Sequence, residues 1–292
     1  MELSIIIVSY NVKEKLEKNL STIFEFYGGF PLEVFVVDNA SIDGSADMVA
    51  EKFPQTKLIK NERNLGFAKA NNIAIRQAQS NFILLLNPDM LIFPETFINS
   101  LVFAKQNPRA VVSSCLLLNG NNETIKHVRR FPKLSDQLLI ILKLPHIFPK
   151  ILKSYLCHDF DYNLSQKVDS VRGSFFLINK KAYQAISEGK NPLLDERYFV
   201  WFEEVDFCRQ VYKMGGEVWY NAKSFCIDYI GQSFSLLKRG RTQKYFSESM
   251  LKYFKKWQPK WQYYILKLFW PLGKLLTFIF SFFIKPKSGF KN

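Results

Sequence analysis

A single aspartate after a buried strand is the first place in this sequence where chemistry is expected. Residues Phe82–Leu86 are all apolar and indicate a strand, and Asn87 and Pro88 separate them from Asp89. Because Pro88 has no amide hydrogen, the strand ends there and the Asp89 carboxylate is held just beyond it. A carboxylate fixed at such a strand end is suited to hold a divalent cation against phosphate oxygens. A plain Asn-Pro-Asp turn would account for the same residues.

A second group of carboxylates, Glu203, Glu204 and Asp206, falls within four positions of an expected helix start. Glu203 and Asp206 are three residues apart and share a helix face, whereas Glu204 points elsewhere. Like charges repel, so such a cluster is typical of a place that faces water, a metal or a proton in transfer. A carboxylate with a pKa raised by desolvation can take a proton from a hydroxyl. The alternative is a solvated helix start that the helix dipole favours.

Alternating strands and helices must position these groups. Strands are expected at 3–9, 33–37, 57–60, 82–86, 110–118, 171–179, 217–220 and 225–230, and helices at about 11–27, 64–79 and 91–106. The βα order of the first half predicts a doubly wound, mostly parallel α/β sheet. Asp38 ends the second strand, so Asp38 and Asp89 should face one crevice, although Asp38 alone would also suit a turn. The first turn lacks GxGxxG, which argues against a dinucleotide site of that type.

These segments resemble, in order, the inverting glycosyltransferases of family 2, which have the GT-A fold. The matching pieces are Ile7–Asn11, Val36–Ser41, Asn64–Asn72, Leu85–Asp89, Gly173–Phe176, Asp195–Phe199 and Phe202–Arg209. The combination covers about residues 2–235. It is similar above all to the rhamnosyltransferase-like members of the family.

The resemblance implies a nucleotide-sugar site at the strand ends. Ser9, Tyr10 and Asp38 would line the base pocket, and Asp38 would accept the imide N–H of uracil or thymine. The other donor-binding residues that it implies are Asn64, Gly66, Asn71 and Asn87. Asn87 has this role because Asn87-Pro88-Asp89 stands where the family has DxD.

The resemblance also implies a metal site. Asp89 would bind Mg²⁺ or Mn²⁺ in place of the last Asp of DxD. Asp228 would be a second ligand, since it stands where many members have the His of His-x-x-Gly-x-Ser. A carboxylate oxygen is a hard ligand that suits these cations.

The general base and the acceptor side follow from the same resemblance. Glu204 stands where the family's Glu-Asp-x-Asp has its general base, with Glu203 and Asp206 as catalytic neighbours. Gly173 and Trp201 would lie on the acceptor side.

Positive charge is concentrated in the carboxyl-terminal tail. The chain of 292 residues has a net charge of +14, and residues 236–292 hold thirteen Lys and Arg and one acidic residue. The run 263–284 is mostly apolar but includes Lys267, Pro271 and Lys274. We expect a tail that lies on or dips into an anionic membrane rather than a full span, with a core-packing helix as the alternative. Aromatics of this tail would form a belt at the headgroups: Tyr245, Phe246, Tyr253, Phe254 and Trp257.

Residues 127–157 form a second basic and apolar segment. They suit an acceptor-side loop, a membrane-touching helix or an ordinary packed helical excursion. The amino terminus enters a strand without a basic region and cleavage site, which favours a cytoplasmic body.

The sequence therefore predicts a GT-A glycosyltransferase domain over 1–235, with a nucleotide-sugar half (1–110) and an acceptor half (111–235), and a membrane-associating tail over 236–292. The expected reaction is inverting transfer from dTDP-rhamnose or a UDP-sugar to a hydroxyl of a polyprenyl-diphosphate-linked glycan. It would take place at the cytoplasmic face of the inner membrane in bacterial cell-surface polysaccharide synthesis.

Three other classes fit the sequence less well. A sugar nucleotidyltransferase would need a Gly-rich, basic phosphate loop near the amino terminus, and Val8–Asn11 offers none. A nucleic-acid binder would use the basic, aromatic tail, but the apolar run to Ile284 argues against it. An inactive relative that acts as a membrane scaffold would not need Asp38, Asp89 and Glu204.

Overall fold

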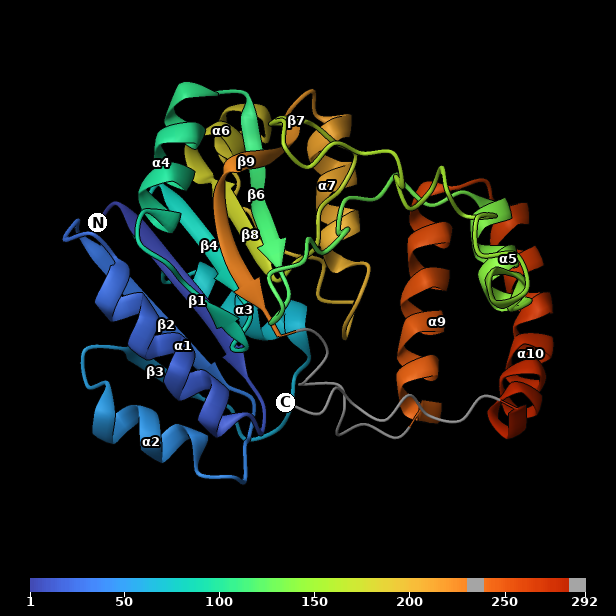
Figure 1. Ribbon diagram of the computed structural model, residues 1–292, viewed down its shortest axis with the longest axis horizontal. Coiled ribbons are helices and arrows are strands. Elements are labelled where there is room, and N and C mark those ends of the chain that lie inside the picture. Colours follow the sequence, from blue (N-terminus) through green and yellow to red (C-terminus); the bar gives the residue numbers. More distant parts are fainter. Residues whose placement is uncertain (230–238, 284–292) are drawn as a thin grey trace.

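Four apolar runs of the first half of the chain form parallel strands of one sheet. The computed structural model describes residues 1–229 and 239–283. Strand β1 (Leu3–Ser9) lies between β2 (Leu32–Asp38) and β4 (Phe82–Leu86), and β3 (Lys57–Lys60) pairs with β2. Helices cover both faces of β1, β2 and β4, and for this reason their sequences are mostly apolar, whereas the edge strand β3 is partly exposed. The predicted parallel α/β arrangement of this half is confirmed (Figure 1).

Beyond β4 the sheet becomes mixed. β8 (Phe175–Asn179) lies antiparallel between β4 and β6 (Ala110–Leu118), and β9 (Glu217–Asp228) runs parallel to β6. The short strands β5 (Met90–Leu91) and β7 (Gln166–Lys167) pair with β9. The prediction of two strands at 217–220 and 225–230 is wrong, because β9 is continuous to Asp228. The polar residues between the two apolar runs form a register shift opposite β6 rather than a turn.

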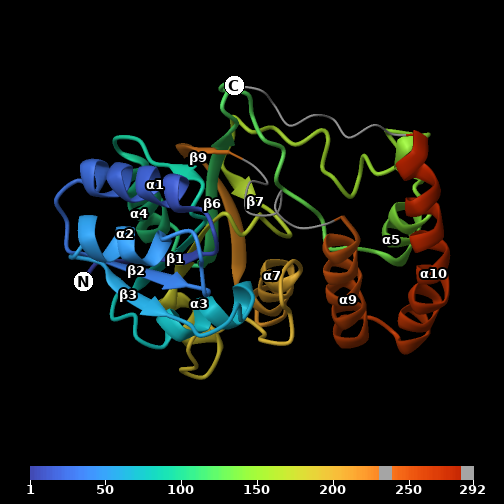
Figure 2. The ribbon, with the colours of Figure 1, turned by 90° about the horizontal axis from the view of Figure 1, so that it is seen from below.

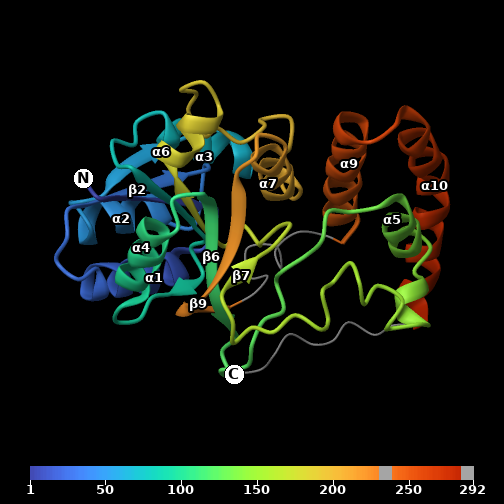
Figure 3. The ribbon, with the colours of Figure 1, turned by 90° about the horizontal axis from the view of Figure 1, so that it is seen from above.

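In the part of the chain that the structure describes, three helices pack on each face of the sheet. One layer contains α1 (Lys13–Phe26), α2 (Ser45–Lys52) and α4 (Thr96–Gln106). The other contains α3 (Phe67–Ile75), α6 (Lys180–Ile186) and α7 (Glu203–Lys213). Figures 2 and 3 show the two layers from opposite sides.

Two of the helices are shorter than predicted. Helix α3 begins after Gly66 and ends at Ile75, rather than spanning 64–79. Helix α4 begins at Thr96, because Met90 and Leu91 pair with β9 and are extended.

The carboxyl-terminal helices form a third layer beside the α/β body. Helices α9 (Arg239–Trp257) and α10 (Lys260–Phe283) pack with each other, and α10 packs against α5 (Leu134–Ile141) (Figure 1). The residues 127–157 are therefore in part a packed helical excursion, which also includes the turn η1 (Leu144–His146).

An aromatic cluster joins α9 to the body. Tyr253 and Phe254 are fully buried, together with Tyr198 and Phe202 from the segment before α7. The prediction that the aromatics of α9 form a headgroup belt is wrong for these side chains, because they pack in a hydrophobic core.

Within residues 1–229 and 239–283, no helix is long and apolar enough to cross a bilayer. Helix α10 carries Lys267, Pro271 and Lys274 within its apolar stretch. The end of the predicted tail, residues 284–292, lies outside the described part of the chain.

Candidate active site

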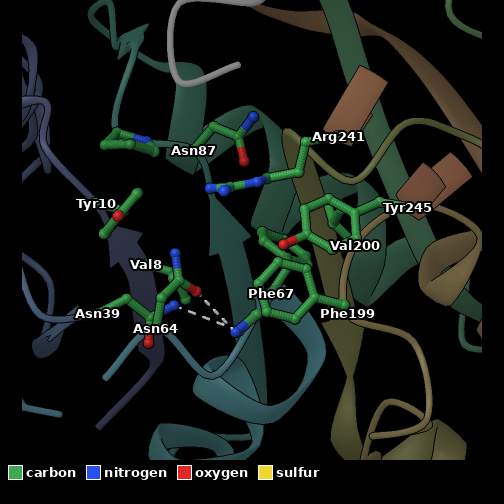
Figure 4. A pocket seen from close by; sticks show the side chains of 12 residues that line it. Val8, Tyr10, Asn39, Asn64, Phe67, Asn87, Phe199, Val200, Arg241 and Tyr245 are labelled. Carbon is green, nitrogen blue, oxygen red and sulfur yellow. Dashed lines mark hydrogen bonds between the residues drawn. The ribbon is translucent and has the colours of Figure 1, made fainter. Parts of the chain in front are cut away.

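A cavity of about 300 Å³ opens at the carboxyl ends of β1 and β4. Figure 4 shows the side chains that surround it. Its lining consists of Val8, Tyr10, Asn39, Asn64, Gly66, Phe67, Asn87, Pro88, Phe199, Val200, Arg241 and Tyr245. Four of the predicted donor-binding residues, Tyr10, Asn64, Gly66 and Asn87, are among them. A volume of this size suits a small organic ligand.

The loop before α3 brings two distant parts of the chain together at this cavity. The Phe67 amide donates a hydrogen bond to the Phe199 carbonyl at 2.7 Å. Gly66 has a φ of +82°, and a Cβ there would lie 2.4 Å from the same carbonyl oxygen. Only glycine allows this approach. Asn64 Oδ1 accepts from the Gly66 amide and fixes the turn.

Ser9 and Asp38 lie opposite each other on β1 and β2, behind the cavity. Asp38 Oδ2 accepts a hydrogen bond from the Ser41 amide at 2.9 Å. Asp38 Oδ1 and Ser9 Oγ are buried and have no hydrogen-bond partner among the residues that the structure describes. Buried polar atoms are almost always paired, so these two are candidates for contact with a ligand.

Asn71 is less exposed to the cavity than predicted. It lies on α3, 1% exposed, and its Nδ2 donates to the Phe67 carbonyl at 2.9 Å. It contacts the backbone of a lining residue and is not itself in the lining. The geometry therefore gives Asn71 a supporting position behind Phe67.

Asp89 and Asp228 are brought together by the pairing of β5 with β9. Met90 pairs with Asp228, and the Tyr229 amide donates to the Asp89 carbonyl at 3.2 Å. Burial raises the pKa of Asp89 to about 6, and the neighbouring Asp228 charge adds to the shift. Burial likewise raises the pKa of Asp228, against the effect of Arg172, whose Nη1 lies 3.5 Å from Asp228 Oδ2.

This carboxylate pair fits a divalent cation. Asp89 Oδ1 is buried without a hydrogen-bond partner in the described ranges, and Asp228 Oδ2, also without a hydrogen bond, forms an ion pair with Arg172. No group of three or more His, Cys, Asp or Glu that could hold a metal lies in that part of the chain. Mg²⁺ is commonly bound by one or two carboxylates together with substrate phosphates, so two protein ligands are enough.

Glu204 lies beside Gly173 at the start of α7. A Cβ on Gly173 would be 3.6 Å from Glu204 Cβ and 3.8 Å from the ring of Phe67, a lining residue. Glu204 and Phe67, a residue of the cavity lining, therefore approach Gly173 from two sides. Burial raises the pKa of Glu204, as a general base for a sugar hydroxyl requires.

The neighbouring carboxylates differ from Glu204. Burial and the charge of Glu204 raise the pKa of Glu203 well above its ordinary value, which favours the neutral form of this carboxyl. Glu203 and Asp206 are buried and Glu204 is half-buried, in agreement with the predicted helix faces.

Asp206, predicted as part of the catalytic group, holds α9 instead. Its Oδ2 accepts from Lys256 Nζ and from Gln210 Nε2, both at 2.7 Å. Its Oδ1 accepts from Trp257 Nε1 at 2.6 Å and from the Tyr198 hydroxyl at 3.1 Å. A carboxylate with four donors is not free to bind a substrate proton. Lys256 and Trp257 are 50 and 51 positions away in sequence, so the local pattern could not reveal them.

We expect Asp206→Ala to lower the free energy of unfolding by about 1–3 kcal/mol, because it leaves the buried Tyr198 hydroxyl and the Trp257 N–H without their acceptor, whereas Lys256 keeps Asp195. Urea unfolding followed by tryptophan fluorescence measures this change. Asp47→Ala is the matched control, since the Asp47 side chain is 86% exposed and its ion pair with Lys60 is worth little. Equal stability of the two variants would contradict the structural role of Asp206.

Trp201 is half-buried, and its ring lies 6.3 Å from that of Phe246 on α9. It is not in the cavity lining. Trp201 and Phe202 both have positive φ, at 64° and 68°. Two successive strained residues at the start of α7 are typical of a functional site.

Helix α9 contributes two side chains to the cavity lining that were not predicted from the sequence. Arg241 and Tyr245 are four residues apart, so they lie on one face of α9, and both line the cavity. The i, i+4 spacing was visible in the sequence. Nothing in it showed which surface this face covers.

The fold is α/β, with a cavity at the carboxyl ends of the strands, and known proteins of this kind are similar to the chain. The family model "Glycosyl transferase family 2" matches residues 4–186. The chain belongs to this family. Its fold is GT-A, as predicted.

Two curated relatives are rhamnosyltransferases. N-acetylglucosaminyl-diphospho-decaprenol L-rhamnosyltransferase of Mycobacterium tuberculosis is 24% identical over 73% of this chain and 71% of its own length. Rhamnosyltransferase WbbL of Escherichia coli is 26% identical over 56% of this chain and 61% of its own length. The family and its rhamnosyltransferase-like character are thus both as predicted.

Solved structures share the fold at low identity. The mannosyltransferase PcManGT of Pyrobaculum calidifontis, in complex with GDP-Man and Mn²⁺, aligns with a TM-score of 0.58 and 18% identity. The alignment covers 94% of this chain and 73% of that one. TarS of S. aureus aligns with a TM-score of 0.52 and 17% identity over 88% of this chain and 73% of that one.

Proposed function

We propose that this chain is an inverting, metal-dependent glycosyltransferase. It moves a sugar from a pyrimidine nucleoside-diphosphate sugar, dTDP-rhamnose or a UDP-sugar, to a hydroxyl of a lipid-linked glycan. The observation that carries the proposal is the pair of buried carboxylates, Asp89 and Asp228, next to a cavity at the strand ends. The names of the rhamnosyltransferase relatives support the donor and a polyprenyl-diphosphate acceptor.

The donor would lie in the cavity with its base towards β1 and β2. Asp38 Oδ1 is suited to accept the imide N–H of uracil or thymine, an N–H that adenine lacks. Asp89 and Asp228 would hold Mg²⁺ or Mn²⁺ next to the diphosphate. The bound cation would neutralise the leaving diphosphate as a Lewis acid. PcManGT was solved with GDP-Man and TarS with UDP, so the proposal of a pyrimidine donor rests on Asp38 and on the names of the rhamnosyltransferase relatives.

Glu204 would take the proton of the acceptor hydroxyl while that oxygen attacks the anomeric carbon from the face opposite the diphosphate. The new C–O bond forms as the bond to the diphosphate oxygen breaks, and the nucleoside diphosphate leaves with the electron pair. The configuration at the anomeric carbon inverts, and no covalent glycosyl-enzyme is needed. Gly173 leaves room for the acceptor hydroxyl beside Glu204.

Helix α10 would dock on an anionic membrane at the cytoplasmic face. Its exposed apolar residues recur at helical spacing and form one stripe: Trp261, Tyr264, Leu268, Leu272 and Leu275. Three exposed lysines, Lys260, Lys267 and Lys274, are seven residues apart and follow one edge of this stripe. An apolar stripe beside a row of lysines is typical of a helix that lies in the interface plane of an anionic bilayer.

The segment after α5 extends this surface. Ile147, Phe148 and Ile151 are exposed, and they follow the helix that packs against α10. Figures 1 and 2 show α5 and α10 side by side at the end of the molecule farthest from α1 and α2. A docked α10 would therefore leave the α/β body in the cytoplasm with its cavity near the membrane surface.

We expect the double variant Leu268→Glu, Leu272→Glu to bind vesicles with phosphatidylglycerol at least about tenfold more weakly than the parent chain, since it places charges in the apolar stripe. Cosedimentation with vesicles measures the affinity. Replacing Lys260, Lys267 and Lys274 by Gln should abolish the preference for anionic over neutral vesicles, because each lysine near the surface contributes about 1 kcal/mol.

The control is Ile42→Glu, which changes an exposed isoleucine beyond the strand ends, outside α10. Its vesicle binding should equal that of the parent chain. Equal binding by all the variants would contradict docking through α10.

The reaction itself is tested by nucleoside-diphosphate release across a panel of nucleotide sugars, with and without EDTA and a bacterial lipid extract. The proposal predicts release from one pyrimidine donor, abolished by EDTA and raised by the lipid. Release unaffected by EDTA would remove the metal role. No release and no binding of any donor would favour a membrane scaffold.

A further inference from the structure

Helix α9 forms one wall of the donor cavity, although it belongs to the basic tail. Arg241 and Tyr245 line the cavity together with Asn87 and Pro88, which immediately precede Asp89. Figure 4 shows the Arg241 side chain extending from α9 into the cavity towards Asn87. The guanidinium therefore lies on the side of the cavity that is next to Asp89.

The position of α9 at this wall is fixed by contacts with the segment 197–200. The ring of Tyr245 stacks on that of Phe199, with centroids 4.6 Å apart and planes at 28°. One turn further on, Ser249 Oγ donates to the Val200 carbonyl at 2.8 Å, and Lys252 Nζ donates to the Arg197 carbonyl at 2.6 Å. The same segment holds the glycine loop, because the Phe199 carbonyl accepts from the Phe67 amide.

The charged side chain in the cavity lining is the cationic Arg241. Among the lining residues in the described chain, no carboxylate is present. The ion pairs found among the described side chains, those of residues 1–229 and 241–276, do not include Arg241. A planar guanidinium offers paired N–H donors that match two phosphate oxygens.

We propose that Arg241 binds the diphosphate of the donor beside Asn87, next to the carboxylates Asp89 and Asp228. This inference rests on the proposed function and names the residue that recognises its leaving group. It also assigns α9 to the donor site. Helix α9 would then complete the cavity, while α10, which packs against α9, would face the membrane. Arg241 would compensate the negative charge on the leaving diphosphate that the carboxylate pair and its cation leave unpaired.

The test measures nucleotide affinity by calorimetry, with UDP, dTDP, uridine and thymidine as probes in the presence of Mn²⁺. Arg241→Ala should weaken the binding of UDP or dTDP by about tenfold to a hundredfold, the loss of a charge-assisted pair. The matching nucleoside should bind within about twofold of the parent value, because it has no phosphate. Arg241→Lys should recover part of the loss, since it keeps the charge but not the paired donors.

Lys244→Ala is the matched control on the same helix, since Lys244 is exposed and pairs with Glu248. It should bind all four probes as the parent chain does. Unchanged diphosphate affinity in Arg241→Ala would overturn the inference while leaving the proposed function intact. Equal weakening of nucleoside and diphosphate would also overturn it, because α9 would then act only as a wall. A parent chain that binds none of the four probes would overturn the proposed function and the inference with it.

Discussion

Replacing Glu204 by Gln is expected to lower the turnover number by about 10²–10⁴-fold, the usual contribution of a positioned general base. The amide keeps the size of the side chain but cannot take the proton of the acceptor hydroxyl. Donor affinity should change little, because the structure gives Glu204 no place in the lining of the donor cavity. Initial rates of nucleoside-diphosphate release at saturating donor and acceptor measure the effect.

The pH dependence of the rate of the parent chain is a second test of Glu204 as the general base. A base works in its deprotonated form, and burial raises the pKa of Glu204 above the ordinary glutamate value. The rate should therefore fall as the pH falls through this raised pKa, earlier than an exposed glutamate would allow. This acid limb should be absent from the residual activity of Glu204→Gln.

Two further variants test whether the effect is specific to Glu204. Glu203→Gln should lose much less activity than Glu204→Gln, because Glu203 is buried and burial favours its neutral form, which an amide of similar size resembles. Glu51→Gln changes an exposed glutamate at the end of α2 and should leave the rate unchanged. A Glu203→Gln variant that is the more defective of the pair would show that Glu203 is the base.

Replacing Asp89 by Asn is expected to weaken Mn²⁺-dependent UDP or dTDP binding and to lower turnover by about 10²–10³-fold, since a metal contributes several kcal/mol at a leaving diphosphate. The amide cannot neutralise the cation, and Asp228 alone keeps Arg172 as its partner. Calorimetric titration of the nucleotide with and without Mn²⁺ measures the metal contribution directly, independent of turnover.

The fold of Asp89→Asn should be intact, because the change removes one of two buried charges that repel each other. Asp47→Asn, on the exposed side of α2, is the control and should keep the full Mn²⁺ response. A Mn²⁺ response of Asp89→Asn equal to that of the parent chain would show that the cation binds elsewhere or not at all.

The sequence by itself determined the parallel strands of the first half, where they end and which carboxylates follow them. β1, β2 and β4 are short apolar runs, and the residues after them, Asp38 and Asn87–Asp89, stop the strand by their own chemistry. Such features depend on a few neighbouring residues, so they can be predicted without the rest of the chain. The order of the motifs also sufficed to predict the family.

Only the tertiary structure decided what the carboxyl-terminal helices do and which acidic residues are free. Asp206 and Glu204 are two positions apart in one motif, yet packing gives Asp206 to Lys256 and Trp257 and leaves Glu204 beside the cavity. The basic and aromatic residues of α9 suit a membrane surface as well as they suit a core. The choice depends on contacts between residues more than forty positions apart, such as Phe199 with Tyr245, and local composition does not encode those contacts.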